Sequence, residues 1–307
     1  MKKFIPVTIL IIGGIIFGQT VFSQGGGVGI SPLTFELTAN PGDVIENQVK
    51  VYNPSDATVG IRMEVEDFTV EGEIGHVKIE PAGTETYSLT KWVKMEPMEF
   101  VLNPAEQKFV KFTINIPENA EPGGHYGSVL ARTTAVIGGE YVGAAVAGRV
   151  GALVLLSVAG EVEENLTIKD FSAPRYSEYG PIPFTLRFEN KGTVHVKPKG
   201  FVTVTNWFGR KVADIEIPQR NVLPDSIRVI DTALNKKWLW AGKYTATLTG
   251  SYGVSNTHLV PAVITFWAFP WKVGIIILAV LVFFILTRRR WLAAFKVLVR
   301  GERVVKQ

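Results

Sequence analysis

Apolar and polar residues alternate with a period of two along most of this chain, which is the pattern of β-strands that bury one face. Two such runs flank a turn at residues 53–56, with Val51 before it and Ile61 after it. Asn, Pro, Ser and Asp, which make up this turn, favour tight turns. We therefore expect residues 44–65 to form a β-hairpin with one buried face.

Further strands are predicted on both sides of an apolar run in the middle of the chain. Alternating runs at 33–37 and 110–116 lie before it, and we expect Phe112 of the second run to face the core together with Ile61. The apolar run itself, Val150–Val158, is too short to cross a membrane and is expected to be a strand buried on both faces, the last of a first domain. A second set of strands is predicted at Phe184–Phe188, Gly200–Thr205, Val212–Ile217, Ser226–Thr232, Tyr244–Tyr252 and Val260–Phe266.

The N-terminus has the features of a secretory signal. Lys2 and Lys3 precede an apolar run, and small or aliphatic residues follow at 21–23. We expect cleavage before Gln24, so that the chain works outside the cytoplasm.

A second apolar segment, Trp271–Thr287, lies near the C-terminus and has the features of a transmembrane helix. Val, Ile, Leu and Phe make up twelve of its residues between 273 and 286, which favours membrane insertion by roughly 4 to 7 kcal/mol. Trp271 and Lys272 at one end, and Arg288, Arg289 and Arg290 at the other, are expected to anchor it at the two interfaces. The basic residues that follow predict a cytoplasmic C-terminus.

Together these patterns predict an all-β protein of two tandem immunoglobulin-like β-sandwich domains and one C-terminal transmembrane helix. The chain has no cysteine, so each domain has to be stabilised by core burial without disulfides. The expected organisation is a signal peptide at 1–23, a first domain at 24–160, a second domain at 161–270, a transmembrane helix at 271–287 and a basic cytoplasmic tail at 288–307.

The net charge of +4 belongs to the two ends of the chain. Without Lys2, Lys3 and the eight basic residues from Lys272 onward, 22 Lys and Arg face 27 Asp and Glu. The exterior is therefore mildly acidic and lacks a basic stripe with interleaved aromatic residues. This excludes nucleic acid as the expected partner.

Both predicted domains contain an alternating strand that ends in Asn, at Asn53 and at Asn190. Asn tolerates the left-handed backbone conformation and bonds its own backbone, so we interpret the repeated phrase as turn chemistry rather than a binding site.

An ordered set of short phrases resembles the first domain of the WxL-interacting proteins. The phrases are Ser31-Pro32, Pro41-Gly42, residues 51–55, Phe100 to Pro104, residues 114–117 and Gly123 to Gly127. In the second half, residues 190–192 and 241–244, followed by the membrane helix and the basic tail, are similar to the layout of that family. The resemblance implies a membrane-anchored pair of domains, of which the first binds peptidoglycan and the second contacts another protein.

No pattern in the sequence indicates catalysis or a cofactor. The histidines, at 76, 125, 195 and 258, lie far apart, and no zinc-binding motif is present. Glu64 and Glu66 alternate with core residues and are expected to face water rather than act as a glycosidase pair. Glycine pairs at 123–124 and 138–139 are interpreted as turns or bulges. We expect a protein that is not an enzyme and binds no cofactor.

Two function classes remain open from the sequence. The first is a non-catalytic binding or scaffold protein of the bacterial cell surface that links the membrane to cell-wall glycan, to a surface protein, or to both. Trp92, His125 and Tyr126 are the candidate glycan contacts, because sugars expose apolar ring faces edged with hydroxyls and the last two residues follow the Gly123-Gly124 pair. The second class is a chaperone or accessory subunit of a surface assembly that adds a strand to its client.

Overall fold

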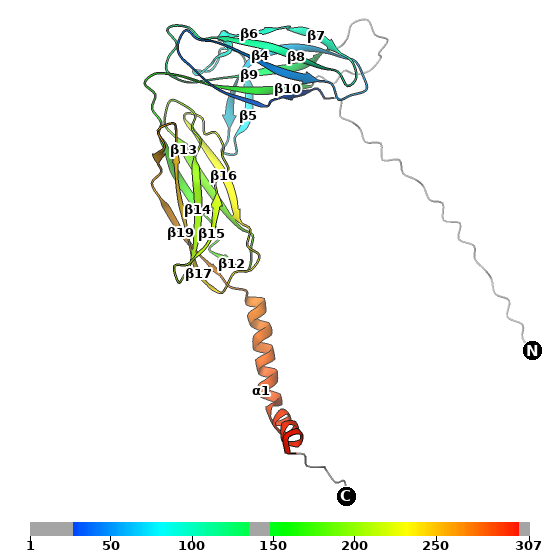
Figure 1. Ribbon diagram of the computed structural model, residues 1–307, viewed down its shortest axis with the longest axis vertical. Helices are drawn as coiled ribbons and strands as arrows, with labels where there is room; N and C mark the ends of the chain where they lie inside the picture. The colour runs from blue at the N-terminus through cyan, green and yellow to red at the C-terminus, as the bar shows by residue number, and fades with distance from the viewer. Residues whose placement is uncertain (1–26, 135–147, 301–307) are drawn as a thin grey trace, which may run out of the picture.

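The structure is a computed structural model that describes residues 27–134 and 148–300. The predicted signal peptide, Gly138-Gly139 and the end of the basic tail lie outside these residues. Two β-sandwiches follow one another and lead into one long helix (Figure 1), which confirms the predicted fold class.

The first domain packs two sheets around its own core. One sheet has the order β1 (Gly29–Ser31), β3 (Val44–Tyr52), β8 (Gln107–Asn115), β6 (Val93–Glu96). The other has the order β2 (Thr34–Ala39), β10 (Arg149–Val158), β9 (Gly123–Thr134), β4 (Val59–Glu71), β5 (His76–Glu80), and β7 (Glu99–Leu102) also pairs with β4. A short 3-10 helix, η1 (Thr90–Trp92), precedes β6. Ile61 and Phe112, predicted to face the core, are each 1% exposed.

The predicted hairpin at residues 44–65 is wrong in its pairing. β3 pairs with β8, and β4 pairs with β9, so the turn after Tyr52 carries the chain from one sheet to the other. The Asn53 side chain holds this crossing, because it donates to the carbonyls of Ala57 and Leu102 at 2.7 and 3.3 Å. Alternation gives each strand a buried face in either arrangement, so it does not distinguish a hairpin from a crossing.

The second domain repeats the sandwich plan with six strands close to their predicted positions. One sheet has the order β11 (Leu166–Ser172), β13 (Ile182–Asn190), β16 (Ser226–Leu234). The other has the order β12 (Tyr176–Ser177), β19 (Ala262–Ala268), β17 (Gly242–Tyr252), β14 (Lys199–Asn206), β15 (Lys211–Glu216), with β18 (Thr257–His258) also paired to β17. Its core is separate from that of the first domain.

The chain leaves β19 through Phe269 and Pro270 and enters α1 (Trp271–Arg300). Residues 271–292 have a mean hydropathy of 2.2 and are not buried by the rest of the protein. At about 1.5 Å per residue this stretch is long enough to cross the hydrocarbon core of a bilayer. The helix continues beyond the predicted end at residue 287, through the three Arg residues.

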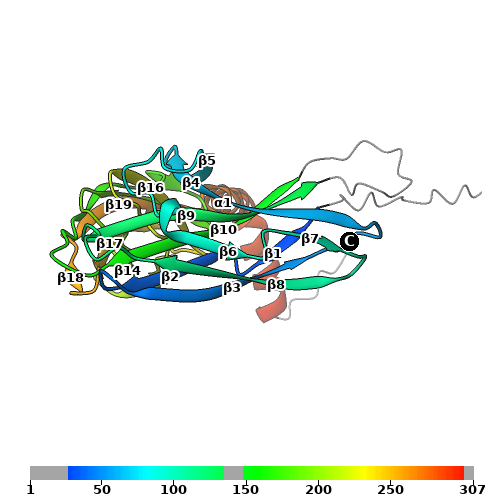
Figure 2. The same cartoon turned by 90° about the horizontal axis from the view of Figure 1, so that it is seen from above.

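The long axes of the two sandwiches differ in direction. The first sandwich lies across the end of the second sandwich that is remote from α1 (Figure 1). Seen from above, the first sandwich extends beyond the second on one side (Figure 2). The hairpin of β4 and β5 leaves the first sandwich and points toward the second domain. This arrangement places the contacts between the domains at the end of the second domain that is far from α1.

Candidate binding cleft between the two domains

The three predicted glycan-contact residues lie close together but are largely covered. The Trp92 and His125 rings pack with their centroids 4.4 Å apart, and His125 Nε2 donates a hydrogen bond to the Glu121 carbonyl at 2.9 Å. His125 and Tyr126 are only 8% and 5% exposed. They offer a sugar little contact area, so their role in glycan binding stays a prediction.

The predicted turn or bulge at Gly123-Gly124 is wrong, because both glycines belong to the start of β9 and pair with β10 in unbroken register. These glycines allow the backbones of the two domains to come close together. The Gly124 N–H donates to the Thr193 carbonyl of the second domain at 2.9 Å. A Cβ on Gly123 would lie 2.9 Å from the same oxygen, and its φ of 127° also disfavours other residues.

An apolar cluster also joins the two domains. Phe68, Tyr126 and Leu155 of the first domain form it, and Leu223 of the second packs against it. Burial raises the pKa of the Tyr126 hydroxyl well above its usual value. The two domains are therefore joined by buried apolar surface as well as by polar contacts.

The tip of the β4–β5 hairpin makes a second contact. The Glu73 carboxylate accepts two hydrogen bonds from Arg187, one of them from Nε at 2.7 Å, and the Glu73 carbonyl accepts one from the Val229 N–H at 2.7 Å. Val229 belongs to β16, which is an edge strand. The hairpin tip thus occupies part of an edge that would otherwise be open to another strand.

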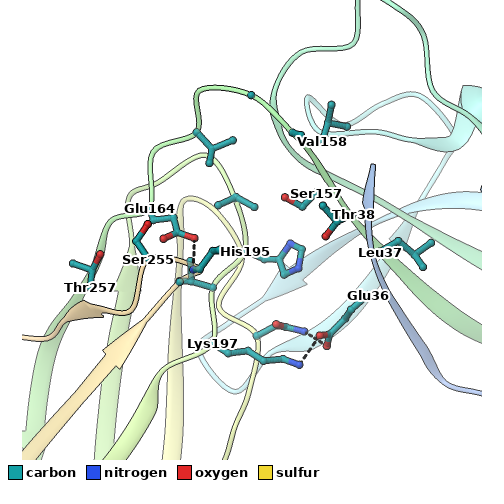
Figure 3. A pocket seen from close by; sticks show the side chains of 18 of the residues that line it. Glu36, Leu37, Thr38, Ser157, Val158, Glu164, His195, Lys197, Ser255 and Thr257 are labelled. Atoms are coloured by element: carbon teal, nitrogen blue, oxygen red, sulfur yellow. Dashed lines mark hydrogen bonds and ion pairs between the residues drawn. The ribbon is translucent and has the colours of Figure 1, made fainter. Parts of the chain in front are cut away.

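Beside these contacts, on the β2 side of the first domain, the two domains form an open cleft of about 780 Å³. Its wall in the first domain comes from β2 and the end of β10, and its wall in the second from residues 194–199 and 253–257. Figure 3 shows Glu36 and Thr38 of β2 facing His195 and Lys197 across this space.

A polar network on Glu36 spans the cleft. Its carboxylate accepts hydrogen bonds from Lys197 Nζ at 2.6 Å and Asn221 Nδ2 at 2.8 Å. Burial alone raises the pKa of Glu36, but the two hydrogen bonds and the Lys197 charge outweigh this effect and keep the pKa below its ordinary value. The network neutralises the one charged side chain of β2.

His195 lies beside this network and shares a hydrogen bond with the Tyr126 hydroxyl through Nδ1 at 3.3 Å. Burial lowers the pKa of the His195 imidazole to about 4, against the opposing effect of Glu36 and with support from Lys197. The ring is therefore neutral at pH 7, and it contributes shape and hydrogen bonding rather than charge to the cleft.

β2 has one free edge along the rim of the cleft. The Leu33 and Ala39 carbonyls accept hydrogen bonds from the β10 side, at 2.9 and 2.8 Å. Because successive residues of a strand point their backbone groups to opposite sides, the N–H and C=O groups of Thr34, Glu36 and Thr38 face away from β10. Within the described residues no strand pairs with that side.

The carboxylates considered for glycoside hydrolysis have structural partners. Glu64 and Glu66 both bond Arg149 on the sheet surface, at 3.1 and 2.6 Å. Asp67, the next residue of β4, is fully buried and accepts from Ser88 Oγ at 2.6 Å and from the Thr84 N–H at 2.9 Å. Within residues 27–134 and 148–300, no three His, Asp or Glu side chains converge on a common metal position.

The cleft residues Glu36, His195, Lys197 and Asn221 were not singled out as a site by their sequence pattern. Glu36 is separated from Lys197 by 161 positions. Each has an ordinary place in an alternating strand or loop, and only the packing of the two domains brings them together.

No protein-family profile and no curated protein sequence matches this chain. Similar solved structures include the class 5 fimbriae chaperone CfaA, the E. coli chaperone DraB and a PapD-like domain of human CEP192, each 13% identical. The alignments cover 80%, 79% and 52% of this chain and 100%, 96% and 99% of those chains, with TM-scores of 0.39, 0.35 and 0.32. Similarity at this level of sequence identity and TM-score does not indicate a partner or a ligand for this chain.

Proposed function

We propose that this chain is a non-catalytic binding protein of the bacterial cell surface that holds an extended segment of a protein partner along β2, at the rim of the interdomain cleft. In this proposal α1 anchors the protein in the cell membrane as a single span, both sandwiches lie outside the cell, and the basic tail lies in the cytoplasm. The observation that carries the proposal is the free edge of β2.

The edge of β2 lacks the devices that usually prevent strand pairing. Proteins protect exposed edges with Lys, Pro or a bulge. β2 has none of these between Thr34 and Ala39, and its register with β10 is uninterrupted. The charge on Glu36 is neutralised by Lys197. The backbone N–H and C=O groups of three β2 residues are available to an incoming strand. Because these hydrogen bonds involve only main-chain atoms, strands of many different sequences can form them.

The lining of the cleft favours a protein partner over a glycan. Aromatic rings commonly stack on the apolar faces of sugars, because a flat apolar surface matches them. Among the described residues that line the cleft there is no Phe, Tyr or Trp. A scaffold would keep its bound strand, whereas a chaperone would release it to an assembly, and both uses depend on the same edge.

Proline substitution tests the proposal. Thr38→Pro removes an N–H that faces the free edge and leaves the β10 ladder intact. The matched control is Glu216→Pro on β15, an edge strand of the second domain that also has six residues. The Ile217 N–H donates to Gly200 at 3.0 Å, so the neighbouring Glu216 N–H faces outward.

Tagged full-length protein and both variants are purified in detergent from cell envelopes, and bound proteins are identified by mass spectrometry. We expect a partner that binds the wild type and Glu216→Pro but not Thr38→Pro. Equal capture by all three proteins, with unchanged β-sheet circular dichroism, would show that the β2 edge is not the binding site.

A further inference from the structure

The end of the second domain next to α1 exposes a cluster of large aromatic side chains. Trp207 and Phe208 form the turn between β14 and β15 and are 65% and 68% exposed. Trp238 and Trp240 belong to the loop between β16 and β17 and are 66% and 89% exposed. Single exposed apolar residues are common on soluble proteins, but four large aromatic residues gathered at one end are not.

Both loops lie where the chain enters the membrane helix. A Cβ on Gly242 would be 3.1 Å from the Trp207 ring, and Gly242 pairs with Ala268, three residues before α1. The Tyr244 hydroxyl donates to the Trp240 carbonyl at 2.9 Å, which holds the second loop to the same end. We call Trp207, Phe208, Trp238 and Trp240 the aromatic end.

The backbone of the aromatic end is ordered by local hydrogen bonds rather than by burial of its rings. Asn206 Oδ1 accepts from the Phe208 and Arg210 N–H groups at 3.1 and 2.9 Å. The Trp207 and Phe208 rings pack together with centroids 4.1 Å apart. The turn therefore holds its apolar surface outward, and this surface has no protein partner within the described residues.

The chain between the second domain and α1 is short and held in place. The Tyr176 hydroxyl donates to the Phe269 carbonyl at 2.8 Å, and the Phe269 N–H donates to the Ser177 carbonyl at 3.0 Å. Lys272, in the first turn of the helix, pairs with Glu178 of the domain at 3.1 Å. If α1 spans the membrane, this end of the domain has to lie at the bilayer surface.

The charges around the aromatic end are mostly positive. The two loops, residues 206–212 and 234–244, contain no Asp or Glu. They carry Arg210, Lys211, Lys236, Lys237 and Lys243, of which Lys211 is paired with Asp214 at 2.7 Å. Basic side chains next to a membrane are attracted to anionic headgroups, by about 1 kcal/mol each.

We propose that the aromatic end is a membrane-contacting surface, in which the four aromatic side chains enter the interfacial layer of the outer leaflet and the neighbouring basic side chains bind anionic lipid headgroups. Trp favours this layer because its ring is apolar and its N–H is polar. One helix holds the domain at a single point, whereas this second contact sets the tilt of the domain. The surface thereby fixes the direction in which the distant cleft opens. The inference rests on the membrane anchor of the proposed function, but not on its protein partner.

Because the chain has no cysteine, single labelling sites can be introduced without further change. An environment-sensitive NBD fluorophore is attached at Ala241→Cys beside Trp240, at Ser255→Cys, or at Ile277→Cys within α1. Ser255 is exposed and lines the cleft at the opposite end of the same domain, so it is the matched control. Full-length protein is placed in nanodiscs of phosphatidylcholine, with or without phosphatidylglycerol and with or without a bromolipid quencher.

We expect a blue-shifted, quenched signal at 241 and at 277, and an unquenched signal at 255. Phosphatidylglycerol should increase quenching at 241, and Lys236→Gln with Lys237→Gln should reduce that increase. Replacement of all four aromatic residues by Ser should return the 241 signal to that of 255.

Quenching at 277 without quenching at 241 would overturn the inference and leave the anchor standing. Loss of quenching at 277 would overturn the anchor itself. Shielding at 241 that depends on protein concentration in detergent, without quenching by bromolipid, would show that a second copy of the chain covers the aromatic end, and this would also overturn the inference.

Discussion

Asn53 and Asn190 hold equivalent corners in the two domains, where the chain crosses from one sheet of a sandwich to the other. In each, Nδ2 donates to the carbonyl four residues later, at 2.7 and 2.9 Å, and to a carbonyl from a distant part of the chain, at 3.3 and 2.9 Å. Oδ1 accepts from the N–H two residues later, at 3.0 and 2.9 Å. The repeated sequence phrase therefore marks a repeated structural element.

Loss of either corner should destabilise its domain. Asn53→Ala or Asn190→Ala leaves buried carbonyl groups without donors, and we expect each to cost about 2 to 3 kcal/mol of unfolding free energy. Urea denaturation followed by circular dichroism measures this cost. Asn115→Ala, at an exposed position on β8, is the control and should change little. A similarly small change for Asn53 and Asn190 would contradict a structural role for the corners.

The core of the first domain can be tested within one strand. Phe112 is 1% exposed and Phe109 is 54% exposed, and both lie on β8. Phe112→Ala should cost about 3 to 5 kcal/mol and Ile61→Ala about 2 to 5, whereas Phe109→Ala should cost much less. Trp92 is the one tryptophan before residue 160, so once the six other tryptophans are replaced by Phe its fluorescence reports unfolding of this domain. Equal losses for Phe109 and Phe112 would mean that the strand faces are wrongly assigned.

Acid should weaken the joint between the domains through His195. Its pKa is about 4 in the folded protein and about 6.5 when unfolded, so between these values the unfolded state binds the additional proton. The neutral ring contributes fully to the free energy of unfolding above pH 6.5. This contribution falls by roughly 2 to 3 kcal/mol as the pH falls toward 4.

His195→Gln, which does not titrate, should remove this part of the pH dependence of stability. His258→Gln, at an exposed site in the same domain, is the control and should retain it. Parallel stability curves for the wild type and His195→Gln between pH 4 and 6.5 would exclude His195 as the titrating group.

The orientation in the membrane has a direct test. Protease added to intact protoplasts should digest the chain before Trp271 and leave a fragment of residues 272–307, because the basic residues after the helix favour the cytoplasmic side. A C-terminal epitope tag detects this fragment. Loss of the tag together with protection of both sandwiches would reverse the orientation and contradict the proposed surface location.

Glycan binding by the first domain is tested by sedimentation with purified sacculi. If Trp92 contacts the sugar, Trp92→Ala should reduce co-sedimentation, and Trp92→Phe, which retains an aromatic ring beside His125, should preserve most of it. Circular dichroism controls for folding. Absence of wild-type co-sedimentation, with retention of a protein partner, would leave the β2 edge as the supported binding site.

Much of this protein was determined locally by its sequence. Period-two alternation placed Ile61 and Phe112 in the core and located six strands of the second domain, because a strand needs only its own side chains to define a buried face. The apolar helix after Pro270 was predictable for a similar reason, since its composition alone suits a bilayer.

Only the tertiary structure decided which segments meet. Alternation is the same in a hairpin and in a crossing between sheets, so the sequence did not show that β3 and β4 lie in opposite sheets. Glu36 and Lys197 form one network, and Trp207 and Trp240 form one surface, because the packing of whole sheets brings distant loops together. The strands are specified by neighbours along the chain, whereas the cleft and the aromatic end arise from contacts between residues far apart in it.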